Sequence, residues 1–129
     1  MDDYAKMTND ELSAAVAEKV MGWRLIDRQL AGWDKGPPVW GTRDAEALTY
    51  QDFTPASSWH EAGMVVEQLR RKYQVTIVMM GETVLVDLIK LGGKGPACIA
   101  NKQHQHFPRA VCLAAMEAHV RETEHAATA

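Results

Sequence analysis

The chain has 129 residues, of which 47% are hydrophobic and 24% are charged, and its formal net charge is −3. This length suits one domain with a substantial core, and the composition is that of a globular protein. The charge excludes the basic field that general nucleic-acid binding needs, and no apolar run is long enough for a membrane span. Because the amino end is acidic and has no apolar run, we expect no secretory signal and a cytoplasmic protein.

The first predicted helix begins after Thr8. Thr8 and Glu11 have the spacing of a capping box, in which each side chain bonds the other residue's backbone amide. Apolar residues then recur at helical spacing, and Gly22 is a suitable stop.

Residues 25–55 show neither a helical nor a strand period, although they hold four aromatic residues, including Trp33 and Trp40. Connections longer than about 12–15 residues are uncommon in compact domains and are often functional. The aromatic residues argue against disorder, because their side chains need burial or a partner. We expect an aperiodic Trp-rich loop that either binds a ligand or packs on the body of the domain.

A second capping box, formed by Ser58 and Glu61, predicts a helix to about residue 71. The expected apolar face of this helix includes Trp59 and Leu69.

Residues 73–80 and 83–90 are rich in apolar and β-branched side chains, and only two residues, beginning with Gly81, separate them. Such a short connection fixes the register of a hairpin, so Ile77 should face Val86.

One face of this hairpin is apolar and is predicted to be core. The other face carries Val78, Met80, Leu85 and Ile89 among polar residues. That face is too apolar for open water, so we expect a helix or a second subunit to cover part of it and the protein to form a homo-oligomer.

A short third strand is predicted over residues 97–100, and Pro108 suits the first turn of a last helix. The pattern predicts an α+β fold in which a small antiparallel sheet of about three strands packs against helices. We expect a single domain over residues 8–124, with a flexible lead at 1–7 and a frayed tail at 125–129.

Three stretches resemble the phage ABA sandwich domain family, whose members are small proteins of bacteriophages and prophages. These stretches are residues 11–23, the helix that follows Ser58, and residues 110–116. The resemblance extends over about residues 7–120. It implies an α-β-α sandwich with helices packed on both faces of the sheet, and it implies no activity and no catalytic residue.

No complete catalytic or metal-binding motif is visible in the sequence. His104 and His106 could begin a metal site, but zinc needs three or four ligands and no Asp, Glu or Cys lies close in sequence. The Gly-rich turn around Lys94 lacks the spacing of a P-loop, and Cys112 lies in an apolar helical stripe where thiols are usually inert. We expect no metal, no cofactor and no enzymatic activity.

Basic residues surround the predicted start of the last helix: Lys102, His104, His106 and Arg109. Free backbone amides and the helix dipole favour an anion at such a position, phosphate included. The alternative is an ordinary solvated helix entry with basic residues there by chance.

If an anion binds there, Trp33 and Trp40 would provide a stacking surface for an attached base, and Trp23 would support the loop. The alternative is that these rings pin the loop to the domain. On the binding hypothesis, Arg109→Ala weakens ligand binding and leaves the melting temperature nearly unchanged.

The leading functional hypothesis is a phage-encoded protein that sequesters a small phosphorylated ligand without turning it over. A nucleotide or cyclic nucleotide that signals in host immunity is the expected type of ligand. The alternative is an inhibitor that uses the Trp-rich loop against a host enzyme. A small hydrolase is the weakest hypothesis, because no acid–base pair or metal set is visible.

Overall fold

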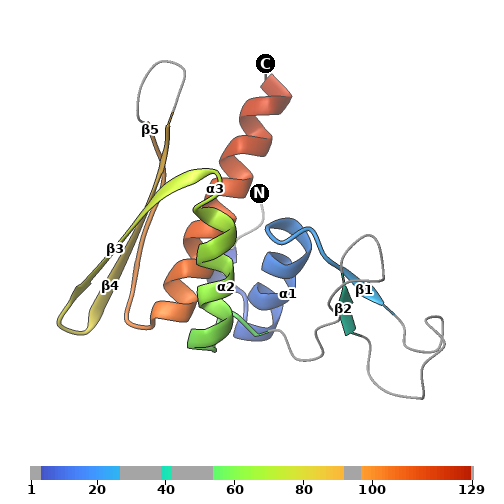
Figure 1. Ribbon diagram of the computed structural model, residues 1–129, viewed down its shortest axis with the longest axis horizontal. Helices are drawn as coiled ribbons and strands as arrows, with labels where there is room; N and C mark the ends of the chain where they lie inside the picture. Colours follow the sequence, from blue (N-terminus) through green and yellow to red (C-terminus); the bar gives the residue numbers. More distant parts are fainter. Residues whose placement is uncertain (1–3, 27–38, 42–53, 92–96, 129) are drawn as a thin grey trace.

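The computed structural model describes the backbone of residues 4–26, 39–41, 54–91 and 97–128, and the side chains of residues 4–23, 54–91 and 97–123 (Figure 1). No helix in these parts of the chain is long and apolar enough to cross a membrane. The described elements, in chain order, are η1 (Tyr4–Lys6), α1 (Asn9–Lys19), β1 (Arg24–Ile26), β2 (Val39–Gly41), α2 (Trp59–Leu69), β3 (Tyr73–Met80), β4 (Thr83–Lys90), β5 (Ala97–His104) and α3 (Phe107–Thr128).

Strands β3, β4 and β5 form an antiparallel sheet in that order. The predicted hairpin is confirmed: Ile77 pairs with Val86, and Gly81 in the connection has a φ of +59°, which glycine adopts without strain. The third strand is longer than predicted, because its pairing with β4 continues as far as Val84 and His104.

The core lies between the sheet and the helices. Helix α3 packs along β4 and β5, while α1 and α2 pack against α3 (Figure 1). Each large apolar side chain that folding buries stabilises the domain by about 1.5–3 kcal/mol, and the alanines of α3 allow close approach of its neighbours. The fully buried core side chains include Leu12, Val16, Val65, Val86, Leu88, Ala110, Val111 and Ala114.

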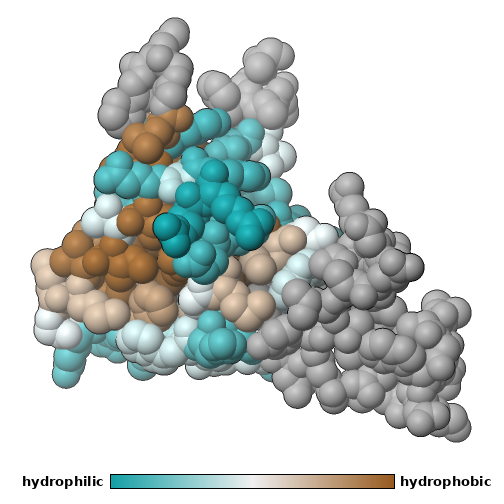
Figure 2. Space-filling model, in the orientation of Figure 1, coloured by the Kyte–Doolittle hydropathy of each residue, from teal (hydrophilic) through white to brown (hydrophobic). Residues whose placement is uncertain are grey.

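The described helices lie on one side of the sheet. The α+β fold with a three-stranded antiparallel sheet is confirmed, but α2 packs on the same face as α3 and contacts β3 from there. On the opposite face Val78 is 37% exposed and Met80 is 52% exposed. Figure 2 shows hydrophobic side chains gathered over the β3–β4 hairpin, beside the hydrophilic surface of α2.

The segment expected to lack regular structure contains two short strands. In a separate two-stranded sheet, Leu25 of β1 pairs with Trp40 of β2. The prediction of an aperiodic loop over residues 25–55 is therefore wrong at β1 and β2, because strands of three residues are too short to show an alternating pattern. Trp33 lies outside the described residues.

Both ends of the domain are more regular than expected. Residues 4–6 form the 3-10 helix η1, and the Arg109 guanidinium bonds the carbonyl oxygens of Ala5 and Met7. Residues 4–7 are thus held against α3, which differs from the expected flexible lead. At the other end, the backbone of α3 continues to Thr128.

Candidate functional site

Two of the four basic residues predicted to bind an anion already have partners within the protein. Lys102 lies on β5, and its Nζ is 2.7 Å from Oε2 of Glu117 on α3. The Arg109 guanidinium donates to Asn9 Oδ1 at 2.7 Å and to the Met7 carbonyl oxygen at 2.7 Å. These contacts occupy the groups that an anion at the β5–α3 corner would need.

The two histidines lie together at that corner. The His106 backbone amide donates to Nδ1 of His104 at 3.0 Å, and the ring centroids are 5.5 Å apart. Burial and the nearby positive charges of Arg109 and His106 lower the pKa of His104. In the described part of the chain, no group of three potential ligands could hold a metal ion.

An aromatic residue that the sequence analysis did not assign to a site lies beside the histidines. Trp59 is 62% exposed and stacks on Phe107, with ring centroids 4.5 Å apart. Trp59 also lines a groove of about 240 Å³, together with His106 and Arg109. Helical periodicity places Trp59 on the apolar face of α2, but it is the first residue of that helix and its ring extends beyond the core.

Of the three tryptophans predicted to contribute to the ligand site, Trp23 alone has a described side chain. Trp23 is half-buried and packs against the hydrophobic core. Trp33 and the side chain of Trp40 lie outside the described residues, so their predicted roles stay predictions.

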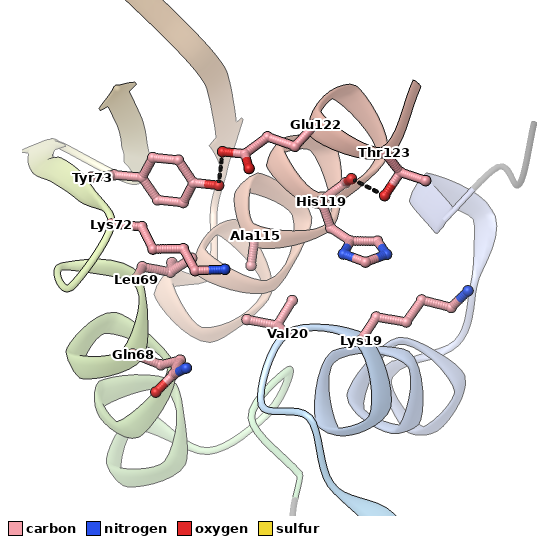
Figure 3. A pocket seen from close by; sticks show the side chains of 10 residues that line it. All are labelled: Lys19, Val20, Gln68, Leu69, Lys72, Tyr73, Ala115, His119, Glu122 and Thr123. Atoms are coloured by element: carbon pink, nitrogen blue, oxygen red, sulfur yellow. Dashed lines mark hydrogen bonds between the residues drawn. The ribbon is translucent and has the colours of Figure 1, made fainter. Parts of the chain in front are cut away.

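A different pocket forms further along α3, where α1 and α2 end and β3 begins (Figure 3). His119, which contributes to it, lies twelve residues after Phe107, or roughly 18 Å along the helix axis. The pocket has a volume of about 340 Å³. Apolar residues line one part of it, and the rest is polar: Lys19, Gln68, Lys72, Tyr73, His119, Glu122 and Thr123.

Positive charge predominates in this pocket. Figure 3 shows the Lys72 ammonium beside Ala115, the His119 imidazole on the other side of Ala115, and the Lys19 ammonium beyond the imidazole, directed away from Lys72. Neither lysine forms an ion pair or a hydrogen bond with another described residue. Burial and the charges of the two lysines lower the pKa of His119 from its usual 6.5, and Glu122 partly opposes this effect. A bound anion would offset the repulsion between the two lysines and a protonated His119.

The Glu122 carboxylate forms the acidic part of the pocket. The Tyr73 hydroxyl donates to Oε1 of Glu122, and Nζ of Lys90 is 3.8 Å from the same oxygen. Burial and the bond to Glu122 raise the pKa of Tyr73, so the phenol remains a neutral donor. No described group donates a hydrogen bond to the other carboxylate oxygen, Oε2.

Sequence reasoning missed this pocket because its charged residues come from separate elements. Lys19 ends α1, Lys72 precedes β3, and His119 and Glu122 lie on α3. A lysine in the last turn of a helix is common for electrostatic reasons alone, so Lys19 gave no functional signal.

Residues 14–116 match the phage ABA sandwich domain, a range that covers most of the chain. The chain belongs to the phage ABA sandwich domain family. Within this phage ABA sandwich protein, Lys19 and Lys72 lie inside the matched range, whereas His119 and Glu122 follow it.

A solved structure has a similar fold. It is the 2.0 Å crystal structure of a phage protein from Bacillus cereus ATCC 14579, with a TM-score of 0.58 and 16% sequence identity over 87% of each chain. At this identity the likeness concerns the fold alone. A search of curated proteins found no match.

Proposed function

We propose that this phage ABA sandwich protein binds a small phosphorylated ligand, without turning it over, in the pocket formed by Lys19, Lys72 and His119. The observation that carries the proposal is the excess of positive charge in a concave site, with both lysines free of described ion-pair partners. Two ammonium groups can neutralise a phosphate dianion, and the imidazole can donate a hydrogen bond to it.

The size and lining of the pocket support a small ligand. Its volume of about 340 Å³ is near the lower end of the roughly 300–1,000 Å³ typical of small-molecule sites. Val20, Leu69 and Ala115 offer an apolar surface beside the cations, which suits the ring of a sugar or a base. A nucleotide-type signal of host immunity combines a phosphate with such a ring. A phage protein present in stoichiometric amounts could sequester it.

Binding without turnover is the simpler use of these groups. A general base is normally oriented by a partner that bonds its second nitrogen. Neither imidazole nitrogen of His119 bonds another described residue, and the pKa of Tyr73 is raised well away from neutral pH.

Calorimetric titration with phosphate and with mono-, di- and cyclic nucleotides tests the proposal. Lys72→Ala should weaken binding of the tightest ligand by about ten- to a hundredfold, because it removes a charge-assisted contact. Arg71→Ala is the matched control, since Arg71 is the adjacent cation, is exposed and does not line the pocket. A ligand recovered in cleaved form would show that the protein is an enzyme instead.

A second function, inhibition of a host protein, is favoured by the exposure of Trp59. Exposed tryptophans are over-represented among residues that dominate protein–protein binding energy. This function would use the Trp59–Phe107 stack at the β5–α3 corner. Trp59→Ala should then abolish inhibition of the host enzyme and leave phosphate binding unchanged.

A further inference from the structure

We infer that the ligand carries a hydrogen-bond donor, a hydroxyl or an amino group, which bonds Oε2 of Glu122 while its phosphate contacts Lys19, Lys72 and His119. The inference rests on the proposed function and names the ligand class more closely. A phosphorylated sugar or a nucleoside monophosphate fits this description, whereas a bare phosphate or a polyphosphate does not.

Glu122 is the acidic residue in a pocket whose other charged residues are cationic. A site for bare anions gains nothing from a carboxylate on its wall, because like charges repel. The repulsion would be strongest for a ligand with several phosphates in a pocket of about 340 Å³. The carboxylate therefore selects against extra negative charge and favours a ligand whose second polar group is a donor.

The two oxygens of the Glu122 carboxylate differ in their hydrogen bonding. Tyr73 and Lys90 both engage Oε1 of Glu122, which fixes the side chain. The lone pairs of Oε2 accept no hydrogen bond from a described residue, so a ligand donor can approach that oxygen. A carboxylate held in place in this way binds a donor without first having to be ordered.

Uncharged side chains line the pocket between its cationic residues and Glu122. Figure 3 shows Ala115 near the centre of the pocket, with Val20 below it and Gln68 to one side. The apolar groups can contact the face of a ring, and the Gln68 amide can donate to or accept from a second polar group. A ligand with an anionic end, a ring and donors at its edge uses all of these features.

The test compares ligands of equal charge on the wild-type protein. Methyl phosphate has no donor, ribose 5-phosphate adds hydroxyl groups, and adenosine monophosphate adds an amino group as well. The wild-type protein should bind one or both of the larger ligands at least tenfold more tightly than methyl phosphate. Tighter binding of ribose 5-phosphate assigns the donor to the sugar, and tighter binding of adenosine monophosphate alone assigns it to the base.

The variant Glu122→Gln should change the affinities for methyl phosphate and for the larger ligands in opposite directions. The Tyr73 hydroxyl can still donate to the amide oxygen, which leaves the NH₂ group facing the ligand donor. Methyl phosphate should bind several-fold more tightly, because the variant removes a negative charge from the pocket. The preferred larger ligand should bind about tenfold more weakly, because its donor loses the carboxylate acceptor. Thermal unfolding of the variant checks that it folds, and the wild-type comparison does not depend on it.

The outcomes separate this inference from the proposed function. If no phosphate compound binds the wild-type protein, the proposed function is wrong. If methyl phosphate binds as tightly as the larger ligands, or if Glu122→Gln shifts all ligands in the same direction, the donor inference is wrong and the phosphate site remains.

Discussion

At the scale of single residues, Arg109 stabilises the fold, although its position at the start of a helix had predicted a contact with a ligand. It lies in the first turn of α3, where an anion contact was expected. Its guanidinium instead bonds Asn9 Oδ1 and the carbonyl oxygens of Ala5 and Met7, which joins η1 and the start of α1 to α3. No sequence pattern links Arg109 to residues about a hundred positions earlier.

Arg109→Ala should therefore lower the free energy of unfolding, by about 1–2 kcal/mol for partly exposed hydrogen bonds to a charged group. This corrects the expectation of an unchanged melting temperature. Arg109→Lys should be only a partial rescue, because an ammonium group cannot reproduce the planar fork. Denaturant unfolding measures the change. Unaltered stability together with weaker phosphate binding would restore the β5–α3 corner as the ligand site.

His119 should report on the charge of its pocket. Because burial, Lys19 and Lys72 lower its pKa below 6.5 in the folded protein, the unfolded chain binds more protons near that pH. The contribution of His119 to stability is thus fully present above pH 6.5. It is lost as the pH falls below 6.5 and passes through the lower pKa of the folded protein. A bound phosphate should raise the His119 pKa. NMR titration of the imidazole, with and without ligand, checks both shifts, and a pKa that the ligand lowers would contradict them.

At the scale of elements, the two predicted capping boxes have different outcomes. The box at α1 is complete, with the Thr8 amide 3.0 Å from Glu11 Oε1 and the Glu11 amide 3.2 Å from Thr8 Oγ1. At α2, Ser58 Oγ accepts from the Glu61 amide, but the Glu61 carboxylate bonds the Thr54 amide at 2.9 Å. Glu61 is only 6% exposed. Its carboxylate therefore stabilises the turn that precedes α2, and it does not cap the Ser58 amide as the sequence had predicted.

Removal of the two glutamates should therefore have unequal effects. Glu61→Ala leaves the partly buried Thr54 amide without its acceptor and should cost about 1–3 kcal/mol of unfolding free energy. Glu11→Ala, at the exposed box, should cost about 0.5–1 kcal/mol. Denaturant unfolding of the two variants measures this difference. Equal losses would mean that the Thr54 contact contributes little.

The strands show what sequence patterns can and cannot predict. The β3–β4 hairpin was predictable to the residue, because both strands have a clear pattern and the connection has two residues. The second half of β5 was missed because Asn101 to His104 are all polar. The ladder to β4 and the Lys102–Glu117 ion pair hold that half in place, and both are long-range contacts.

At the scale of the whole molecule, the candidate pocket could not be predicted from the sequence. Its residues are brought together from α1, the end of α2, the start of β3 and the middle of α3, so no local spacing marks them. The sequence did indicate the phage family, which is confirmed, and it also predicted an anion site. It assigned that site to Lys102 and Arg109, whose internal partners appear only in the folded chain.

We also expect the protein to self-associate through the sheet face that no described helix covers. Val78 and Met80 are exposed on that face, next to the half-buried Leu85 and Ile89. Light scattering at micromolar concentration should give a multiple of the 14.3 kDa chain mass, and Val78→Glu should reduce it to one chain. Glu82→Lys, in the hairpin connection, is a charge-changing control. A single-chain mass for the wild-type protein would contradict the prediction.

The most direct test of the central claim is a calorimetric titration with ribose 5-phosphate or adenosine monophosphate, whichever binds more tightly, of the wild-type protein and of the double variant Lys19→Ala with Lys72→Ala. We predict saturable binding to the wild-type protein at one site per chain, recovery of intact ligand from the heated complex, and loss of at least a hundredfold in affinity in the folded double variant. Equal affinity for the two proteins would contradict the claim that this pocket is the phosphate site.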